Sequence, residues 1–319
     1  MTQLAEHRLG RSDVVVTELS FGGAALGNLF ATVDDETAAA TIEAAWAGGI
    51  RTFDTAPHYG LGLSERRIGA ALRAKPRSEF TISTKVGRLL IPAADAQGMD
   101  TEGFAVPATH CRQFDFSADG VRRSLESSLD RLGLDRIDIA LIHDPDNHGE
   151  QALREAYPAL AKLRAEGVVG AIGAGMNQAE MLTWFVTETD VDVVLLAGRY
   201  TLLDRRAADR LLPAALDRGV SVLVGGVFNS GLLANPTVDA TFDYRAAPAS
   251  LVERARAIDV TCASFGVPLR AAAVRFPLMH PAVASAVIGA RSPYEITEAI
   301  DYRGLSIPAD LWSELAEMV

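Results

Sequence analysis

Residues 51–73, RTFDTAPHYGLGLSERRIGAALR, show the pattern that decides the fold. A short apolar run ends at the carboxylate of Asp54, a loop with glycines follows, and an amphipathic helical stretch comes next. The same order of strand and then helix recurs along the chain, in eight units in all. Ser64 is the expected N-cap of this helix, and Asp34 or Asp35 is that of the helix before it, which Gly48 and Gly49 can end. Strands that are buried on both faces and alternate with helices predict a parallel sheet. Eight units in 319 residues fit a closed (β/α)8 TIM barrel better than an open sheet.

Three further segments extend this predicted barrel. Residues 7–19, HRLGRSDVVVTEL, predict a two-stranded hairpin that closes the barrel floor. Residues 268–278 add a helical stretch before the eighth strand, and residues 307–318 predict a final helix. No linker composition interrupts the pattern, so we expect residues 1–319 to form a single barrel domain with extra helices near the C-terminus.

Two long intervals break the regular alternation. They cover residues 88–116, after the third strand, and residues 229–248, after the seventh. Loops of this length in a compact domain are usually functional or mobile. Both would leave the barrel at the carboxyl ends of its strands, where barrel enzymes hold their active sites.

The composition is that of an acidic globular protein. Hydrophobic residues make up 49% of the chain, charged residues make up 22%, and the net charge is −11. Nucleic acid is not an expected partner, because phosphate binding needs a basic stripe. The sequence shows neither an apolar signal segment nor a membrane-spanning stretch. Cys111 and Cys262 lie far apart and indicate reduced thiols rather than a disulfide framework, so we expect a cytoplasmic protein.

Side chains with acid–base chemistry follow three successive strands. The carboxyl ends of parallel barrel strands meet at one mouth, so Asp54, Lys85 and His143 should gather there. Tyr59 follows in the loop after the first of these strands. A buried lysine needs an anion, and Asp54 is the nearest candidate. An ammonium group beside Tyr59 would favour the phenolate and lower the pKa of that tyrosine.

These groups together predict proton transfer for a carbonyl and alcohol pair. Tyr59 would be the acid or base, His143 would donate a hydrogen bond to the reacting oxygen, and a separate agent would carry the hydride. The histidines and aspartates of residues 143–148 could also suggest a metal site, but Asp-Pro-Asp-Asn is ordinary turn chemistry, so no metal is expected. The glycines of residues 170–177 lack Gly-x-Gly-x-x-Gly spacing, so a Rossmann fingerprint is not expected either.

Five segments resemble the aldo-keto reductase superfamily, and the resemblance covers essentially the whole chain. They are FDTAPHYGLGLSERRIG, ISTKVG, LIHDPD, GAGMN and FNSGLLA. The resemblance implies an NAD(P)-dependent oxidoreductase with Tyr59 as general acid/base. Lys85 and Asp54 would tune that tyrosine, and His143 would orient the substrate oxygen.

The resemblance also implies a nicotinamide cofactor, although some positions depart from the family pattern. Met176 stands where a serine is usual, Ala197 replaces a glutamine, and Gly225 falls where an aromatic residue commonly stacks on the nicotinamide. Both NAD and NADP remain open, with NAD favoured, because Gly289 replaces a lysine of many NADP-preferring relatives and Glu295 adds a carboxylate nearby. The implied cofactor-binding residues are Gly23, Asn177, Phe228, Ser230, Gly231, Gly289, Ala290, Arg291 and Glu295.

Within the superfamily, the chain looks most like the aldose 1-dehydrogenases that act on L-fucose, D-arabinose or L-galactose and form aldonolactones. His58, Asp144 and Asn229 are the residues expected to bind sugar hydroxyl groups. Another aldehyde or ketone, such as a pyridoxal-like substrate, is the alternative within the same superfamily. A cofactor-sensing subunit with little turnover, like the β subunits of potassium channels, is the alternative from another class. We expect a small-molecule partner and leave the oligomeric state open.

Overall fold

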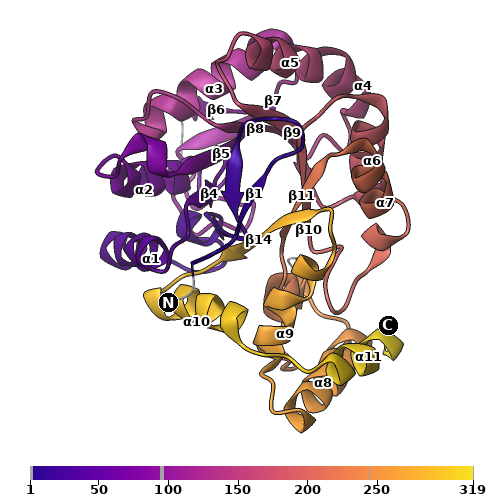
Figure 1. The fold of residues 1–319 in the computed structure, drawn as a ribbon. Coiled ribbons are helices and arrows are strands. Elements are labelled where there is room, and N and C mark those ends of the chain that lie inside the picture. The colour runs from indigo at the N-terminus through magenta and orange to yellow at the C-terminus, as the bar shows by residue number, and fades with distance from the viewer. Residues whose placement is uncertain (1–2, 94–96, 244, 319) are drawn as a thin grey trace.

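Eight parallel strands close into a barrel in this computed structural model, which describes residues 3–93, 97–243 and 245–318. Neighbouring barrel strands follow the order of the chain, and the last strand pairs with the first. The architecture confirms the predicted (β/α)8 barrel (Figure 1). The barrel strands are β3 (Leu19–Gly22), β4 (Thr52–Asp54), β5 (Thr81–Val86), β8 (Ile139–His143), β9 (Ala171–Met176), β10 (Val193–Ala197), β11 (Ser221–Gly225) and β14 (Val283–Gly289).

Helices surround the strands; α1 to α9 lie in the connections between successive barrel strands, and α10 follows the last of these strands (Figure 1). The outer helices are α1 (Asp35–Ala47), α2 (Leu63–Leu72), α3 (Ala118–Leu132), α5 (Tyr157–Ala165), α6 (Ala179–Glu188), α7 (Leu211–Arg218), α8 (Ala249–Ser264), α9 (Leu269–Arg275) and α10 (Pro293–Gly304), and α11 (Ala309–Glu317) follows the barrel. Short helical turns are η1 (Ala25–Gly27), η2 (Arg77–Glu79), α4 (Gly149–Gln151), η3 (Ala152–Ala156), η4 (Arg206–Ala208) and η6 (Pro277–Met279). The predicted extra helices near the C-terminus correspond to α9 and α11.

An N-terminal hairpin closes one end of the barrel, as predicted. Strands β1 (Glu6–Arg8) and β2 (Val15–Thr17) pair antiparallel. Leu9 and Val16 are buried in a cluster with residues at the beginning of the barrel strands, such as Ile139 and Val193. The hairpin therefore covers the amino ends of the strands and leaves their carboxyl ends for the functional site.

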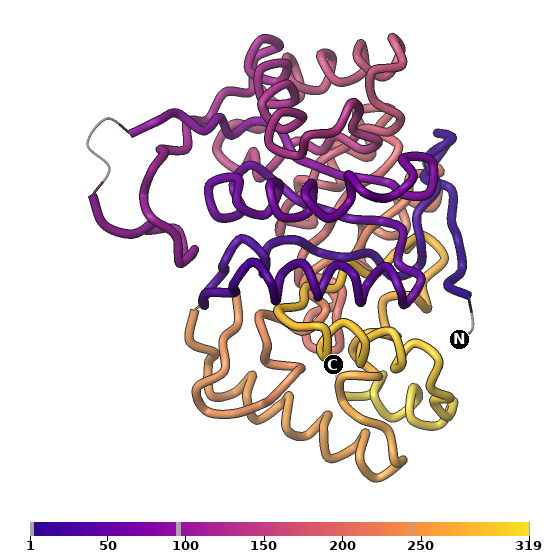
Figure 2. The backbone as a smooth tube through the Cα atoms, turned by 90° about the vertical axis from the view of Figure 1, so that its left-hand side faces the viewer, coloured from indigo at the N-terminus to yellow at the C-terminus, as the bar shows by residue number. Residues whose placement is uncertain are grey.

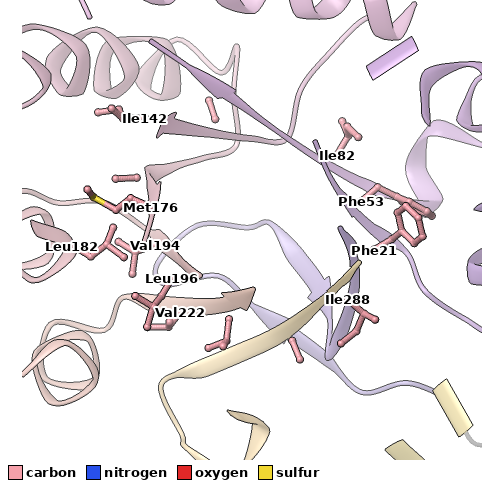
Figure 3. Packing of buried hydrophobic residues seen from close by; sticks show 14 of the residues in the cluster. Phe21, Phe53, Ile82, Ile142, Met176, Leu182, Val194, Leu196, Val222 and Ile288 are labelled. Carbon is pink, nitrogen blue, oxygen red and sulfur yellow. The ribbon is translucent and has the colours of Figure 1, made fainter. Parts of the chain in front are cut away.

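The main core lies between the strands and the helices. Figure 3 shows side chains from successive strands, among them Phe21, Phe53, Ile82 and Val222, in the layer that surrounds the barrel. The rings of Phe21 and Phe53 are fully buried, with centroids 6.1 Å apart. Burying a side chain of this size stabilises a fold by about 1.5–3 kcal/mol. This layer holds the strands in place and so fixes the positions of the residues at their ends.

Helix boundaries agree with the capping pattern at α1 and differ from it at α2. The side chain of Asp34 accepts a hydrogen bond from the backbone N–H of Thr37, and α1 ends at the C-cap Gly48. Ser64 was expected to cap α2, but the helix begins at Leu63 and its N-cap is Gly62, two residues before Ser64. The hydroxyl of Ser64 instead donates to the backbone carbonyl of Gly23 at 2.8 Å. The cap prediction was therefore wrong.

Both long intervals leave the carboxyl ends of the strands and contain secondary structure of their own. Strands β6 (Arg88–Pro92) and β7 (His110–Phe114) form an antiparallel pair in the first interval, whose segment projects beyond the outer helices in Figure 2. The second contains η5 (Asn229–Gly231), β12 (Thr241–Phe242) and β13 (Arg245–Ala246). Residues 94–96 of the first interval and residue 244 of the second lie outside the described residues.

In the described part of the chain, no single helix is long and apolar enough to cross a membrane. Two segments, Ala249–Ser264 and Leu269–Met279, are together long and apolar enough for a membrane span, but a bend of 99° separates them.

Candidate active site

The predicted lysine and aspartate form an ion pair at the mouth of the barrel. Asp54 ends β4, and Lys85 lies near the end of the neighbouring strand β5. The Nζ atom of Lys85 lies 2.6 Å from Oδ2 of Asp54 and donates a second hydrogen bond to the Thr55 carbonyl at 2.9 Å. The other carboxylate oxygen of Asp54 accepts from the Ser83 hydroxyl at 2.9 Å. Both charged groups of this buried pair thus have hydrogen-bond partners, as buried charges require.

Tyr59 is next to this ion pair. The Lys85 ammonium lies 4.7 Å from the centre of the Tyr59 ring and is hydrogen-bonded to the tyrosine side chain. Burial by itself would lower the pKa of Lys85, but Asp54 and Tyr59 more than offset it and raise this pKa above its usual value. Lys85 therefore remains an ammonium group at neutral pH. A fixed positive charge at this distance favours the phenolate form of the tyrosine.

Two histidines complete the cluster, and both are held neutral. The ring of His143, at the end of β8, lies 5.8 Å from the Tyr59 ring and 5.6 Å from the His58 ring. Burial, and then the charges of Arg88 and Lys85, lower the pKa of His143 well below its usual value. Burial and nearby cations lower the pKa of His58 to about 2. Each neutral imidazole carries a single N–H, which can be donated to an oxygen of a bound molecule.

The cluster stands where two cavities meet. We call the first the glycine-lined cavity, because Gly22, Gly23, Gly225, Gly226 and Gly289 form much of its wall. We call the second the histidine-lined cavity, because His58 and His143 line it together with Lys85 and Phe104. Both cavities share the residues Ala24, Leu29, Phe30, Tyr59, Asn177, Leu195 and Ala197. A molecule in each cavity would therefore meet the other beside Tyr59.

Most of the residues predicted to bind a cofactor line the glycine-lined cavity. The exception is Ala290, which is buried and does not contribute to the wall. The predicted residues in the wall are Gly23, Asn177, Phe228, Ser230, Gly231, Gly289, Arg291 and Glu295.

The two ends of the glycine-lined cavity differ in chemistry. Near Tyr59 the wall is apolar, with Leu195, Ala197 and Val287. A Cβ added to Gly225 would lie 3.6 Å from the Leu195 side chain, so β11 leaves open the space that an aromatic side chain would fill. The apolar wall suits the face of a nicotinamide ring.

The other end of the cavity is polar. It is lined by Glu295, Glu298 and Tyr302 of α10 and by Arg270 of the neighbouring helix α9. The helix N-terminus favours a negatively charged group such as a phosphate, and carboxylates can bind ribose hydroxyl groups. The residues of η5 also line this cavity, and Asn229 and Ser230 have positive φ angles of 47° and 57° there. These features fit a nicotinamide dinucleotide.

The three residues predicted to bind substrate are divided between the cavities. His58 and Asp144 line the histidine-lined cavity. Burial raises the pKa of Asp144 to about 6, although Arg88 lies against its carboxylate, with Nη2 2.5 Å from Oδ2, and opposes this shift. Asn229 lies in the glycine-lined cavity instead, where its Nδ2 donates to the Gly198 carbonyl at 3.1 Å. The structure therefore places Asn229 away from His58 and Asp144, in the other cavity.

Polar and charged residues of the first long interval also reach the site, and they were not predicted from the sequence. Glu102 and Thr101 line the histidine-lined cavity, and Arg88 pairs with Asp144 at its edge. Arg112 is buried against Asp100 at 2.6 Å. The unusual length of the interval was the signal that could have drawn attention to these residues.

The barrel and the site together define a nicotinamide-dependent oxidoreductase, because a tyrosine held beside a lysine–aspartate pair faces a cavity that fits a dinucleotide. The model of the Aldo/keto reductase family matches residues 18–319, and the chain belongs to this family. D-threo-aldose 1-dehydrogenase from Pseudomonas sp is 48% identical over 310 residues, which cover 95% of this chain and 94% of that protein. Pyridoxal 4-dehydrogenase from Microbacterium luteolum is 40% identical and covers 96% and 95% of the two chains. The holo structure of an aldo-keto reductase from Bacillus halodurans superposes with a TM-score of 0.79 at 23% identity, over 99% of this chain and 97% of that one.

Proposed function

We propose that the protein oxidises C1 of a free aldose to the aldonolactone, with NAD or NADP as hydride acceptor. The single observation that carries the proposal is the position of Tyr59, which is hydrogen-bonded to the Lys85 ammonium and shared by the walls of both cavities. The choice of an aldose rests on the similarity to D-threo-aldose 1-dehydrogenase. Sugars of the L-fucose, D-arabinose and L-galactose type are the substrates we propose.

In the proposed mechanism Tyr59 moves the proton. Its phenolate, favoured by the Lys85 ammonium, accepts the proton of the anomeric hydroxyl group. Asp54 holds Lys85 in place and keeps it charged. The bound dinucleotide supplies the acceptor for the hydride that leaves C1. His143, as a neutral imidazole, donates a hydrogen bond to the oxygen that becomes the lactone carbonyl.

We propose that Asn177 and the apolar wall near it hold the nicotinamide, and that η5 and the N-terminus of α10 hold the pyrophosphate. NAD should bind at least as well as NADP. Glu298 lines the polar end and pairs with Arg270 at 2.6 Å, so this arginine is already neutralised. Glu295 accepts from the backbone N–H of Arg291 at 2.7 Å. Two carboxylates at this end disfavour an additional phosphate.

We also propose that residues 1–319 act as one domain in the cytoplasm. Cys111 and Cys262 are both free thiols, which suits a reducing compartment.

The test is an assay of the purified protein with L-fucose, D-arabinose, L-galactose and pyridoxal, each with NAD and with NADP, followed by the absorbance of the reduced cofactor. We expect an aldose to give the highest kcat/KM and a lactone to be recovered. The Tyr59→Phe variant should lose about 10²–10⁴-fold in kcat because the proton acceptor is gone, while its Kd for the cofactor stays near that of the wild type. Preference for pyridoxal over every aldose would overturn the proposed substrate class.

A further inference from the structure

We infer that Glu102 binds a hydroxyl group of the substrate and that, with Asp144, it makes the histidine-lined cavity select an uncharged polyhydroxylated substrate over its phosphate ester. This inference deepens the proposed function and rests on it. Glu102 lies in the first long interval, at the edge of the cavity, and its side chain is 48% exposed. A carboxylate in this position can meet a molecule that enters the cavity.

The loop that carries Glu102 is held firmly on both sides. The backbone N–H of Asp100 donates to the Val106 carbonyl at 2.9 Å, and the carboxylate of Asp100 is clamped by the buried Arg112. The neighbouring residue Gly103 accepts a hydrogen bond from the Phe30 N–H at 2.9 Å. The loop is thus tied to the segment after β3 as well as to β7. Glu102 is presented at a defined place and loses little backbone freedom on binding a ligand.

The carboxylate of Glu102 is surrounded by nitrogen atoms but is too far from each for a good hydrogen bond. The nearest are Nη1 of Arg112 at 3.6 Å, Nδ1 of His58 at 3.7 Å and Nη1 of Arg88 at 3.9 Å. His58 Nδ1 is buried and has no hydrogen-bond partner among the residues that the structure describes. This buried nitrogen is not accessible to an entering molecule, but the exposed carboxylate of Glu102 is, and a hydroxyl group of that molecule would donate to it. Carboxylate acceptors form the stronger class of hydrogen bonds.

The charges that face this cavity disfavour an anion. The carboxylates of Glu102 and Asp144 line it, and the lysine in its wall, Lys85, is already paired with Asp54. Arg88 lies against Asp144 and does not appear in the wall. A phosphate group on the substrate would therefore meet two carboxylates without a free cation among the described wall residues. Hydroxyl groups suffer no such repulsion.

The experiment compares L-galactose with L-galactose 6-phosphate as substrates of the wild type and of E102Q, E102D and E314Q. Glu314 is exposed on α11, far along the chain from the site, so E314Q is the matched control. In the wild type we expect kcat/KM for the free sugar to exceed that for the ester at least about tenfold. E102Q should raise KM for the free sugar about tenfold, with kcat and the Kd for NADH nearly unchanged, which is the pattern of lost substrate binding.

The E102D and E102Q variants separate the effect of the charge of Glu102 from the effect of its side-chain length. E102D keeps the charge on a shorter side chain, so it should raise KM for the free sugar but still prefer the free sugar to the ester. E102Q should reduce the ratio of kcat/KM for the free sugar to kcat/KM for the ester. An unchanged KM in E102Q, or equal turnover of sugar and ester by the wild type, would refute this inference while leaving the aldose dehydrogenase proposal in place. Failure of the wild type to oxidise any aldose would refute both.

Discussion

The hydroxyl of Ser64 donates a hydrogen bond to the backbone carbonyl of Gly23, which joins the beginning of α2 to the end of β3. The backbone N–H of Gly23 in turn donates to the carbonyl of Asp54 at 2.7 Å. A Cβ on Gly23 would lie only 2.5 Å from the Ser64 oxygen and 2.8 Å from the Asp54 carbonyl. The site therefore depends on the absence of a side chain at this position.

We expect Gly23→Ala to lower the free energy of unfolding by about 1–3 kcal/mol, because the added methyl group forces the two segments apart. It should also reduce kcat, since the displaced segment carries Asp54. The control is Gly304→Ala at the end of α10, where an added Cβ meets no atom within 4 Å. Urea unfolding and steady-state kinetics measure both effects. Equal stability of the two variants would contradict the expectation.

The Lys85–Asp54 pair gives a second prediction, in which one variant recovers stability without recovering activity. Asp54→Asn leaves the ammonium buried without its anion and should cost about 3–5 kcal/mol of unfolding free energy. The double variant Asp54→Asn/Lys85→Met removes both charges and should recover much of that loss. Turnover should stay low in both variants, because neither presents a normal ammonium to Tyr59. A double variant no more stable than the single one would show that the lost charge is not the cause.

The two histidines of the site, His143 buried and His58 partly buried, predict that the protein loses stability in acid. The pKa of His58 is about 2 in the folded state and 6.5 in the reference state, so the unfolded chain takes up a proton that the folded chain refuses. The resulting stability is present above pH 6.5 and is lost as the pH falls below it. His143 acts in the same direction. Each histidine changes the free energy of unfolding by up to about 1.4 kcal/mol per pH unit in this range.

Asp144 acts in the opposite direction and reduces the net slope. Its folded pKa of about 6 lies above the reference value of 3.8, so the folded state binds a proton first and gains stability as the pH falls between these values. We expect His58→Asn to flatten the decline of unfolding free energy between about pH 6 and pH 4 by roughly the slope of one histidine. Thermal unfolding across this range measures it. The same pH dependence in wild type and variant would show that His58 is not held neutral.

Cofactor preference gives a fourth prediction. Glu298→Gln removes a carboxylate from the polar end of the glycine-lined cavity and frees Arg270 from its 2.6 Å ion pair. The Kd for NADPH should fall about tenfold, or about 1.4 kcal/mol, while the Kd for NADH changes little. Glu253→Gln on the exposed side of α8 is the control. Fluorescence titration distinguishes the outcomes, and an unchanged NADPH affinity would remove Glu298 from the proposed specificity.

The sequence was sufficient to predict the barrel and the place where the four acid–base side chains meet. Asp54, Lys85 and His143 end parallel neighbouring strands, so the closed sheet itself brings them to one mouth. Regular burial on both faces of the strands and the capping residue Asp34 made the elements recognisable. These features depend on local patterns that recur at fixed spacing.

The loop contributions could not be predicted in the same way. Glu102 reaches the site because Arg112 clamps Asp100 and because Gly103 pairs with the segment after β3, and neither contact leaves a periodic pattern. Asn229 was assigned to the substrate, but the tight turn η5 carries it into the other cavity. Ser64 has the residue type of an N-cap, but its hydroxyl donates instead to the backbone carbonyl of Gly23, just after β3. Long-range contacts decided each case.

The N-terminal hairpin at the amino ends of the strands also determines from which end of the barrel molecules can enter and leave. Leu9 and Val16 are packed among the first residues of the barrel strands, so that end offers no passage. In the proposed reaction, sugar and dinucleotide would both arrive from the opposite side, and the lactone would depart by the route along which its parent sugar came. Any hydrolysis of the proposed lactone would then take place in the surrounding solution, after its release.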